Sequence, residues 1–126
     1  MPTHRPVLVI EDHDDTRRMV EELLTFAGFP ACSASNGQEG LVALREHHPC
    51  LILLDLSMPI MDGWRFREAQ LSLREDDLAT VPVVVMSALS RSEQEAERIA
   101  AIECLEKPID IDRMLAVVGQ YCESVA

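Results

Sequence analysis

Each of four apolar stretches in this sequence is followed at once by polar residues that could do chemistry. In chain order these residues are Glu11 with Asp12, then Asp55, Ser87 and Lys107. Carboxylates bind divalent cations, and a hydroxyl and an ammonium can bind the oxygens of a phosphoryl group. If the fold brings the four positions together, the sequence contains the parts of a metal-assisted phosphoryl-transfer site.

The three carboxylates point to Mg²⁺ as the cofactor. Carboxylates brought close together repel one another, and burial raises the cost of keeping them ionised. Mg²⁺ removes this conflict, and it keeps room for water and for a phosphoryl oxygen. We predict Asp12 and Asp55 as direct ligands and Glu11 as a ligand acting through water. The backbone carbonyl of Ser57 is the remaining predicted protein ligand.

Asp55 is also the candidate nucleophile, because a carboxylate beside a cation is already ionised and can attack phosphorus in line. Phosphoryl transfer needs mainly positioning and neutralisation of the phosphoryl oxygens, and Mg²⁺, Lys107 and the Ser87 hydroxyl suit that work. Taken singly, each residue has a simpler interpretation. Asp55 could end a strand, Ser87 could cap a helix, and Lys107 could be a surface charge. Their combination favours the site.

The apolar stretches themselves predict the strands that would position these residues. Three continuous runs, at 7–10, 51–54 and 81–86, are typical of strands buried on both faces of a parallel sheet. Two weaker candidates, at 31–34 and 102–106, are expected at the sheet edges.

The segments between the strands have the apolar periodicity of helices. The expected caps, starts and stops, in chain order, are Asp14 or Asp15, Gly28, Asn36, Gly63, Ser90 or Ser92, and Asp110. The residues expected to face inward are Met19, Val20, Leu23, Leu24 and Ala27 on the first helix, Leu41, Val42 and Leu44 on the second, and Ile111, Met114, Leu115 and Val118 on the fifth.

Strand and helix alternate five times, which predicts an α/β fold with right-handed crossovers. With the edge-like strands second and fifth, we expect a flavodoxin-like (βα)5 doubly wound parallel sheet of strand order 2-1-3-4-5. In such sheets ligands bind beyond the carboxyl ends of the strands, at the switch point. This topology would bring the polar residues that follow the first, third, fourth and fifth strands into one cleft.

Composition limits the partners. The 126 residues suffice for one domain, and 22 acidic against 11 basic residues give a formal net charge of −11. Such a chain is repelled by nucleic acids and by anionic membranes. The sequence contains no apolar run of membrane-spanning length and no signal-peptide core, so we expect a cytoplasmic protein.

The cysteines and histidines show no spacing typical of metal ligands. We expect Cys32, Cys50, Cys104 and Cys122 to be buried or half-buried reduced thiols. We expect His4, His13, His47 and His48 to be surface residues, and Trp64 to pack on the third helix.

The chain resembles the response-regulator receiver domain of two-component signalling over about residues 6–122. No single motif is specific, but four of them occur in order, each at the end of a predicted strand. The matching motifs are Val9-Ile10-Glu11-Asp12, Leu54-Asp55-Leu56-Ser57-Met58-Pro59 with Met61-Asp62-Gly63, Met86-Ser87-Ala88, and Glu106-Lys107-Pro108.

The resemblance implies a phosphoacceptor of a phosphorelay. It implies a sensor histidine kinase or a histidine phosphotransfer protein as donor, a labile phosphoaspartate on Asp55, and a cis bond before Pro108. We expect a single receiver domain over 1–126 without an output domain. Such a protein is a signalling switch that catalyses only its own phosphorylation and dephosphorylation, and we expect a monomer or weak dimer.

The expected output surface comprises the helix after Ser90 or Ser92, the strand at 102–106 and the helix after Asp110. Two departures from the family pattern touch this surface. Cys104 stands where the family usually has an aromatic residue, and the segment 99–102 lacks the customary glycine. We hypothesise that the helix after Ser90 or Ser92 and its preceding loop carry the switch, with a loosely stopped last turn; alternatively, Cys104 only fills the core and little moves.

Other functions fit less well. A haloacid-dehalogenase-type phosphatase needs a second Asp two residues after the nucleophile, and Ser57 stands there. A docking module that is never phosphorylated would not need Asp12, Asp55 and Lys107. Nucleotide binding of the phosphate-loop type is excluded because no glycine-rich loop follows the first strand.

Overall fold

The computed structural model describes residues 5–88, 94 and 97–125. Its centre is a five-stranded parallel sheet of order β2-β1-β3-β4-β5. This order confirms the flavodoxin-like arrangement, and the two weaker strands do lie at the edges. The strands are β1 (Val7–Ile10), β2 (Ala31–Ala34), β3 (Leu51–Asp55), β4 (Val83–Ser87) and β5 (Glu103–Glu106).

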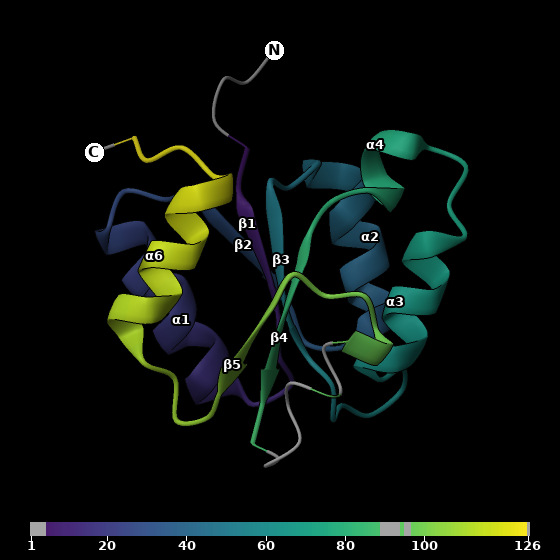
Figure 1. Cartoon of the computed structure of the whole chain (residues 1–126), viewed down its shortest axis with the longest axis horizontal. Coiled ribbons are helices and arrows are strands. Elements are labelled where there is room, and N and C mark those ends of the chain that lie inside the picture. Colours follow the sequence, from purple (N-terminus) through teal and green to yellow (C-terminus); the bar gives the residue numbers. More distant parts are fainter. Residues whose placement is uncertain (1–4, 89–93, 95–96, 126) are drawn as a thin grey trace.

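Helices cover both faces of the sheet (Figure 1). On one face lie α1 (Asp14–Phe26) and α6 (Ile111–Tyr121), and on the other lie α2 (Gly37–His47), α3 (Gly63–Leu71) and the short α4 (Asp76–Ala79). The continuous apolar runs follow from this layering, because alternate residues of a strand point to opposite faces and both faces are buried.

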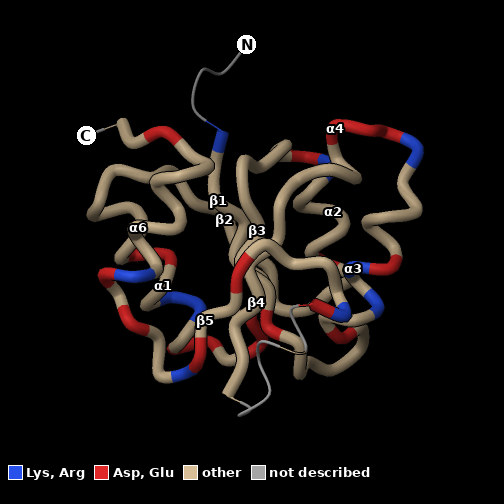
Figure 2. Tube along the Cα trace, in the orientation of Figure 1, with Lys and Arg blue, Asp and Glu red and all other residues tan. Residues whose placement is uncertain are grey.

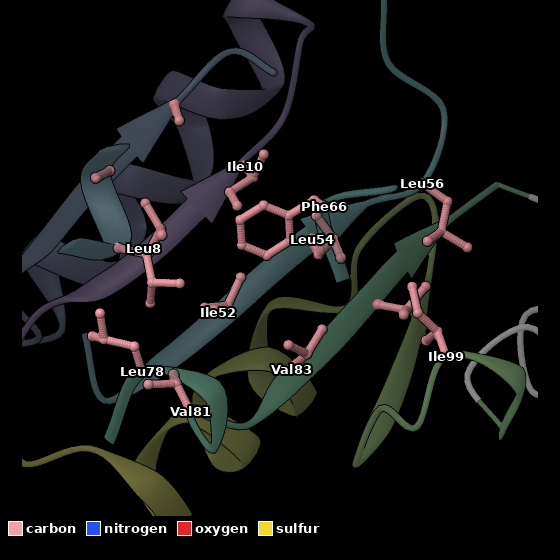
Figure 3. Packing of buried hydrophobic residues seen from close by; sticks show 14 of the residues in the cluster. Leu8, Ile10, Ile52, Leu54, Leu56, Phe66, Leu78, Val81, Val83 and Ile99 are labelled. Carbon is pink, nitrogen blue, oxygen red and sulfur yellow. The ribbon is translucent and has the colours of Figure 1, made fainter. Parts of the chain in front are cut away.

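The central strands divide their side chains between two cores. Val7 and Val9 pack with α1 and α6, whereas Leu8 and Ile10 pack with α2 and α3. Figure 3 shows the second core, in which the fully buried ring of Phe66 on α3 lies beside Ile10 and Leu54. These layers hold the carboxyl ends of the strands in fixed positions.

The first helix starts differently from our prediction. His13, and neither Asp14 nor Asp15, is the N-cap of α1, and its Nδ1 accepts a hydrogen bond from the Thr16 amide. The two aspartates lie in the first turn, where a negative charge interacts favourably with the helix dipole. Gly28, with φ 92°, follows the helix end and confirms the predicted stop.

The other predicted helix starts are confirmed where the structure describes them. Asn36 caps α2, Asp110 caps α6, and Gly63 is the first residue of α3 after the cap Asp62. The start predicted at Ser90 or Ser92 lies outside the described residues.

The buried faces of the helices contain fewer residues than predicted. Val20, Leu24, Leu44, Met114 and Val118 are buried, and Leu23, Ala27, Leu41 and Leu115 are partly buried. Met19, Val42 and Ile111 are instead 44%, 52% and 41% exposed. Consecutive residues of a helix differ by about 100° in direction, so Val42 points about 200° away from the buried Gly40 and Leu44, toward solvent.

Two features near the fourth strand were not predicted. The short helix α4 precedes β4, and Ala100 has φ 57°, a left-handed conformation at the turn before β5. In the described part of the preceding segment, residues 94, 97 and 98 are helical.

The expectation of four reduced cysteines is wrong for two of them. Cys50 and Cys122 form a disulfide, with Cα atoms 5.6 Å apart. They are 72 residues apart in sequence, and only the packing of the end of α6 beside the start of β3 brings them together. Cys32 and Cys104 are free, the first half-buried and the second buried, as predicted.

Most charged residues lie on the outside of the molecule, and the buried ones among the described residues are Glu11, Asp55 and Arg67. Figure 2 shows acidic residues on several elements, including α4, which begins with Asp76 and Asp77. Within the described residues, every helix is too short or too polar to cross a membrane.

Candidate functional site

The sheet brings the predicted site residues to one edge. In its parallel register, Ile10 pairs with Leu54, Asp55 with Met86, and Ser87 with Glu106. The four strands therefore end side by side, and a cleft of about 400 Å³ opens beyond them. All six predicted residues line the cleft, whose lining is Glu11, Asp12, His13, Thr16, Asp55, Leu56, Ser57, Ser87, Ala88 and Lys107.

Three carboxylates of this cleft can hold one cation. Ligand oxygens of Glu11, Asp12 and Asp55 all lie within 4.8 Å of one another. Glu11 and Asp55 are buried, with exposed fractions of 1% and 6%, whereas Asp12 is exposed toward the solvent. Hard oxygen donors with one side open to water are the set that Mg²⁺ prefers, so the residues fit the predicted metal.

Lys107 contacts two of the three acids. Its Nζ donates a hydrogen bond to Glu11 Oε1 at 2.5 Å and lies 3.7 Å from Asp55 Oδ1. The Lys107 amide donates to the Ser87 carbonyl at 2.8 Å, which joins the ends of β4 and β5. The peptide bond before Pro108 is cis, as the family resemblance implied.

The pKa values of the two buried acids are shifted in opposite directions. For Asp55, burial and then the hydrogen bond and charge of Glu11 raise the pKa to about 7, although Lys107 opposes this. For Glu11, burial alone would raise the pKa, but the hydrogen bonds from Lys107 and Asp55 outweigh it and the pKa is lowered. Without a cation, the two acids thus share less than two full negative charges near neutral pH.

We expect Asp55→Asn to stabilise the metal-free protein above neutral pH. A folded-state pKa near 7, above the ordinary 3.8, means that protonation of Asp55 stabilises the fold at low pH and that this stability is lost as pH rises through 7. Between pH 5 and pH 8 the wild type should lose about 2 kcal/mol that Asp55→Asn keeps. Urea unfolding in a chelator at both pH values measures the difference. Equal pH dependence in the two proteins would show that Asp55 is not destabilised.

The loop after β3 is held against the strand end. The Ser57 amide donates to Asp55 Oδ1 at 3.3 Å, and the Gly63 amide donates to the Leu56 carbonyl at 3.1 Å. A Cβ on Gly63 would lie 2.6 Å from the Asp55 carbonyl oxygen, so only glycine allows α3 to start this close to Asp55. The role predicted for the Ser57 carbonyl stays a prediction.

Two residues of the cleft were missed. His13 is exposed, as expected, but it and Thr16 line the cleft while forming the cap of α1. The His13 amide also donates to Glu11 Oε2 at 3.1 Å, and Arg17 donates to the Glu11 carbonyl at 3.0 Å. The start of α1 thereby fixes the backbone and the carboxylate of Glu11. The position of His13 directly after Glu11 and Asp12 is the sequence signal that could have indicated its place in the cleft.

Comparisons with known proteins show the family to which the chain belongs. The family model of the response regulator receiver domain matches residues 7–119. The polar-differentiation response regulator DivK of Brucella anthropi is 31% identical over 121 residues, which are 93% of this chain and 95% of DivK. The regulatory protein AtoC of Escherichia coli is 33% identical over 114 residues, 89% of this chain. The sensor histidine kinase RcsC of Escherichia coli is 32% identical over 123 residues, 94% of this chain. The chain spans only 24% of AtoC and 12% of RcsC.

Solved structures show the same fold. The chemotaxis response regulator CheY4 of Vibrio cholerae has a TM-score of 0.82 at 26% identity, covering 94% of this chain and 99% of that one. The receiver domain of NtrX from Brucella abortus has a TM-score of 0.79 at 26% identity, with 91% and 96% covered.

Proposed function

This chain belongs to the family of response regulator receiver domains, which are signalling switches, and we propose that it accepts a phosphoryl group on Asp55 in a two-component phosphorelay. The observation that carries the proposal is the grouping of Asp55 with Glu11, Asp12 and Lys107 in one cleft at the strand ends.

In the proposed reaction, an Asp55 carboxylate oxygen attacks the phosphorus atom of the donor. The new oxygen–phosphorus bond forms as the bond to the donor's leaving atom breaks, and the leaving group keeps that electron pair. Mg²⁺, when held by Asp12, Asp55, the Ser57 carbonyl and, through water, Glu11, would neutralise charge on the phosphoryl oxygens. Lys107 and the Ser87 hydroxyl would bind the remaining oxygens.

Lys107 has to change partner during this reaction. In the resting protein it is bound to the buried Glu11. A phosphoryl group on Asp55 adds negative charge within about 4 Å of the ammonium, because Nζ already lies 3.7 Å from Asp55 Oδ1. We propose that the ammonium then binds the phosphoryl oxygen, so that phosphorylation changes the contacts of the strand end at β5.

The proposed donor is a sensor histidine kinase or a histidine phosphotransfer protein. We place the protein in the cytoplasm, because the phosphohistidine of such donors is made with cytoplasmic ATP. The charge of −11 disfavours nucleic acids and anionic membranes as partners. A downstream protein partner would bind the surface of β5, α6 and the helix expected after Ser90 or Ser92.

Mg²⁺-dependent labelling tests this function. We expect acetyl phosphate with Mg²⁺ to add one phosphoryl group to the wild-type chain, and to add none after Mg²⁺ is removed with EDTA. Intact-protein mass spectrometry measures both states. Labelling that continues without Mg²⁺, or that adds several groups, would overturn the proposed site. Continuous release of phosphate without a labelled chain would indicate a phosphatase instead.

A further inference from the structure

A buried arginine on α3 lies outside the phosphoryl site and has no part in the proposed reaction. Arg67 is 8% exposed, and burial lowers its pKa. Its Nε donates to the Ile99 carbonyl and its Nη2 to the Ala100 carbonyl, both at 2.9 Å. Its Nη1 donates to Gln70 Oε1 at 2.7 Å. All three bonds end on neutral oxygens, so the guanidinium acts here as a rigid fork of hydrogen-bond donors.

The two carbonyls belong to a turn that would be unfavourable in free energy without the hydrogen bonds from Arg67. Ala100 has φ 57°, which a residue with a Cβ adopts at a cost and glycine does not. The turn ends a helical stretch, and carbonyls at a helix end lack partners within the helix. Arg67 supplies these partners from a neighbouring helix. These bonds oppose the loosely stopped last turn hypothesised from the sequence, which stays a prediction.

Gln70, which accepts a hydrogen bond from Arg67, also binds the segment before β4. Its Nε2 donates to the carbonyls of Leu78 and Val81, both at 3.0 Å, just before β4. The Ile102 amide donates to the Val83 carbonyl at 2.9 Å, which joins the starts of β4 and β5. Figure 3 shows Ile99 near these strands, in the core that Phe66 of α3 also fills. Arg67 and Gln70 thus connect α3 to the segments that precede β4 and β5.

We propose that Arg67 is a positioning residue that fixes the turn at Ile99 and Ala100, so that conformational change on phosphorylation stops at this turn and leaves the start of β5 in place. This limit on the conformational change rests on the proposed phosphoacceptor function. The turn at Ile99 and Ala100 is connected to the phosphoryl site through α3. This helix begins at Gly63, in contact with Asp55, and Arg67 lies one turn further along it. Cys104 on β5 is consistent with this proposal, because a small buried side chain displaces little volume when it changes rotamer.

Hydrogen exchange tests the proposal. Amide exchange of peptides covering 99–103, the turn and the start of β5, is measured with Mg²⁺, with and without beryllofluoride as a phosphoryl mimic, in the wild type, Arg67→Met and Arg65→Met. Arg65 is the matched control because it lies exposed on the same helix. We expect the wild type and Arg65→Met to exchange equally in both states within about twofold. We expect Arg67→Met to exchange about tenfold faster at 99–102, because two charge-assisted hydrogen bonds are lost.

The outcomes separate the two proposals. If beryllofluoride slows exchange at 51–57 and also changes exchange at 99–103 in the wild type, the phosphoacceptor function stands and the fixed turn is wrong. If Arg67→Met exchanges like Arg65→Met, the fixed turn is likewise wrong. If beryllofluoride changes nothing at 51–57 while Arg67→Met still speeds exchange at 99–102, the fixing of the turn by Arg67 stands. The phosphoacceptor function then fails, and with it the proposed limit on conformational change.

A second variant keeps the test open if Arg67→Met does not fold. Ala100→Gly removes the Cβ from the left-handed turn, so we expect it to raise Tm by about 3–5 °C in the wild type. In the Arg67→Met background it should bring exchange at 99–102 back to within about threefold of the wild type. A fall in Tm for Ala100→Gly would contradict the strained turn that Arg67 is proposed to hold.

Discussion

Asp12→Asn is expected to lower the affinity for Mg²⁺ by about 100-fold, and the rate of phosphorylation at limiting Mg²⁺ by a similar factor. Asp12 is the exposed member of the acidic group, so a hydrated cation can reach it from the solvent. The amide keeps the shape of the side chain but removes one of the charges that Mg²⁺ neutralises. Glu11 cannot replace it, because Lys107 already holds the Glu11 carboxylate.

Isothermal titration with Mg²⁺ measures the change, with Asp15→Asn as the matched control. Asp15 is an exposed aspartate three residues further on, in the first turn of α1, and it does not line the cleft. We expect the control to bind Mg²⁺ within about twofold of the wild type. Equal losses in the two variants would mean that general charge, and not ligation by Asp12, attracts the cation.

Lys107→Ala is expected to reduce the rate of phosphorylation by about 30–100-fold while Mg²⁺ affinity stays within about threefold. An ammonium cannot ligate a cation, but it can stabilise the charge that develops on the phosphoryl oxygens. Lys107→Arg keeps the charge and should retain part of the rate. Single-turnover labelling at saturating Mg²⁺ separates the two effects. A loss of Mg²⁺ affinity that exceeds the loss of rate would reverse the roles assigned to Lys107 and Asp12.

The wild type offers a direct view of this side chain. Lys107 is the only lysine of the 126 residues, so lysine labelled with ¹³C at Cε gives a single side-chain NMR signal. We expect this signal to shift on addition of beryllofluoride with Mg²⁺, as the ammonium leaves Glu11 for the bound mimic. An unmoved signal in a protein that binds beryllofluoride would contradict the change of partner.

The sequence allowed the sheet and the grouping of the site residues to be predicted because both depend on local patterns. Short continuous apolar runs are typical of strands covered on both faces, and the carboxyl ends of parallel strands lie at the same end of the sheet. Asn36, Asp110 and Gly28 were also predictable, since a cap or a stop depends on a few neighbouring residues.

The errors arose where contacts join distant residues or where two local rules compete. His13 caps α1 in place of the better cap formers Asp14 and Asp15, because its amide also serves Glu11. The bond between Cys50 and Cys122 spans 72 residues and follows only from how α6 packs.

Arg67 is the most informative omission. An arginine in a helix is usually on the surface, and nothing in its neighbours indicates burial. Its backbone partners lie 32 and 33 residues away, and carbonyls carry no signal in a sequence. Likewise, the pairing of Lys107 with Glu11 could not be predicted, because it joins the ends of β1 and β5, which β3 and β4 separate in the sheet and 96 residues separate in the sequence.

Identifying the residue that carries the phosphoryl group tests the central claim most directly. The wild type is labelled with acetyl phosphate and Mg²⁺, trapped by borohydride reduction of the acyl phosphate, digested, and sequenced by tandem mass spectrometry, with Asp55→Asn treated in parallel. We expect the reduced residue at position 55 alone, and no label in the variant. Label on Asp12, Glu11 or any other residue of the wild type, or equal labelling of Asp55→Asn, would contradict the assignment of Asp55 as the phosphoacceptor.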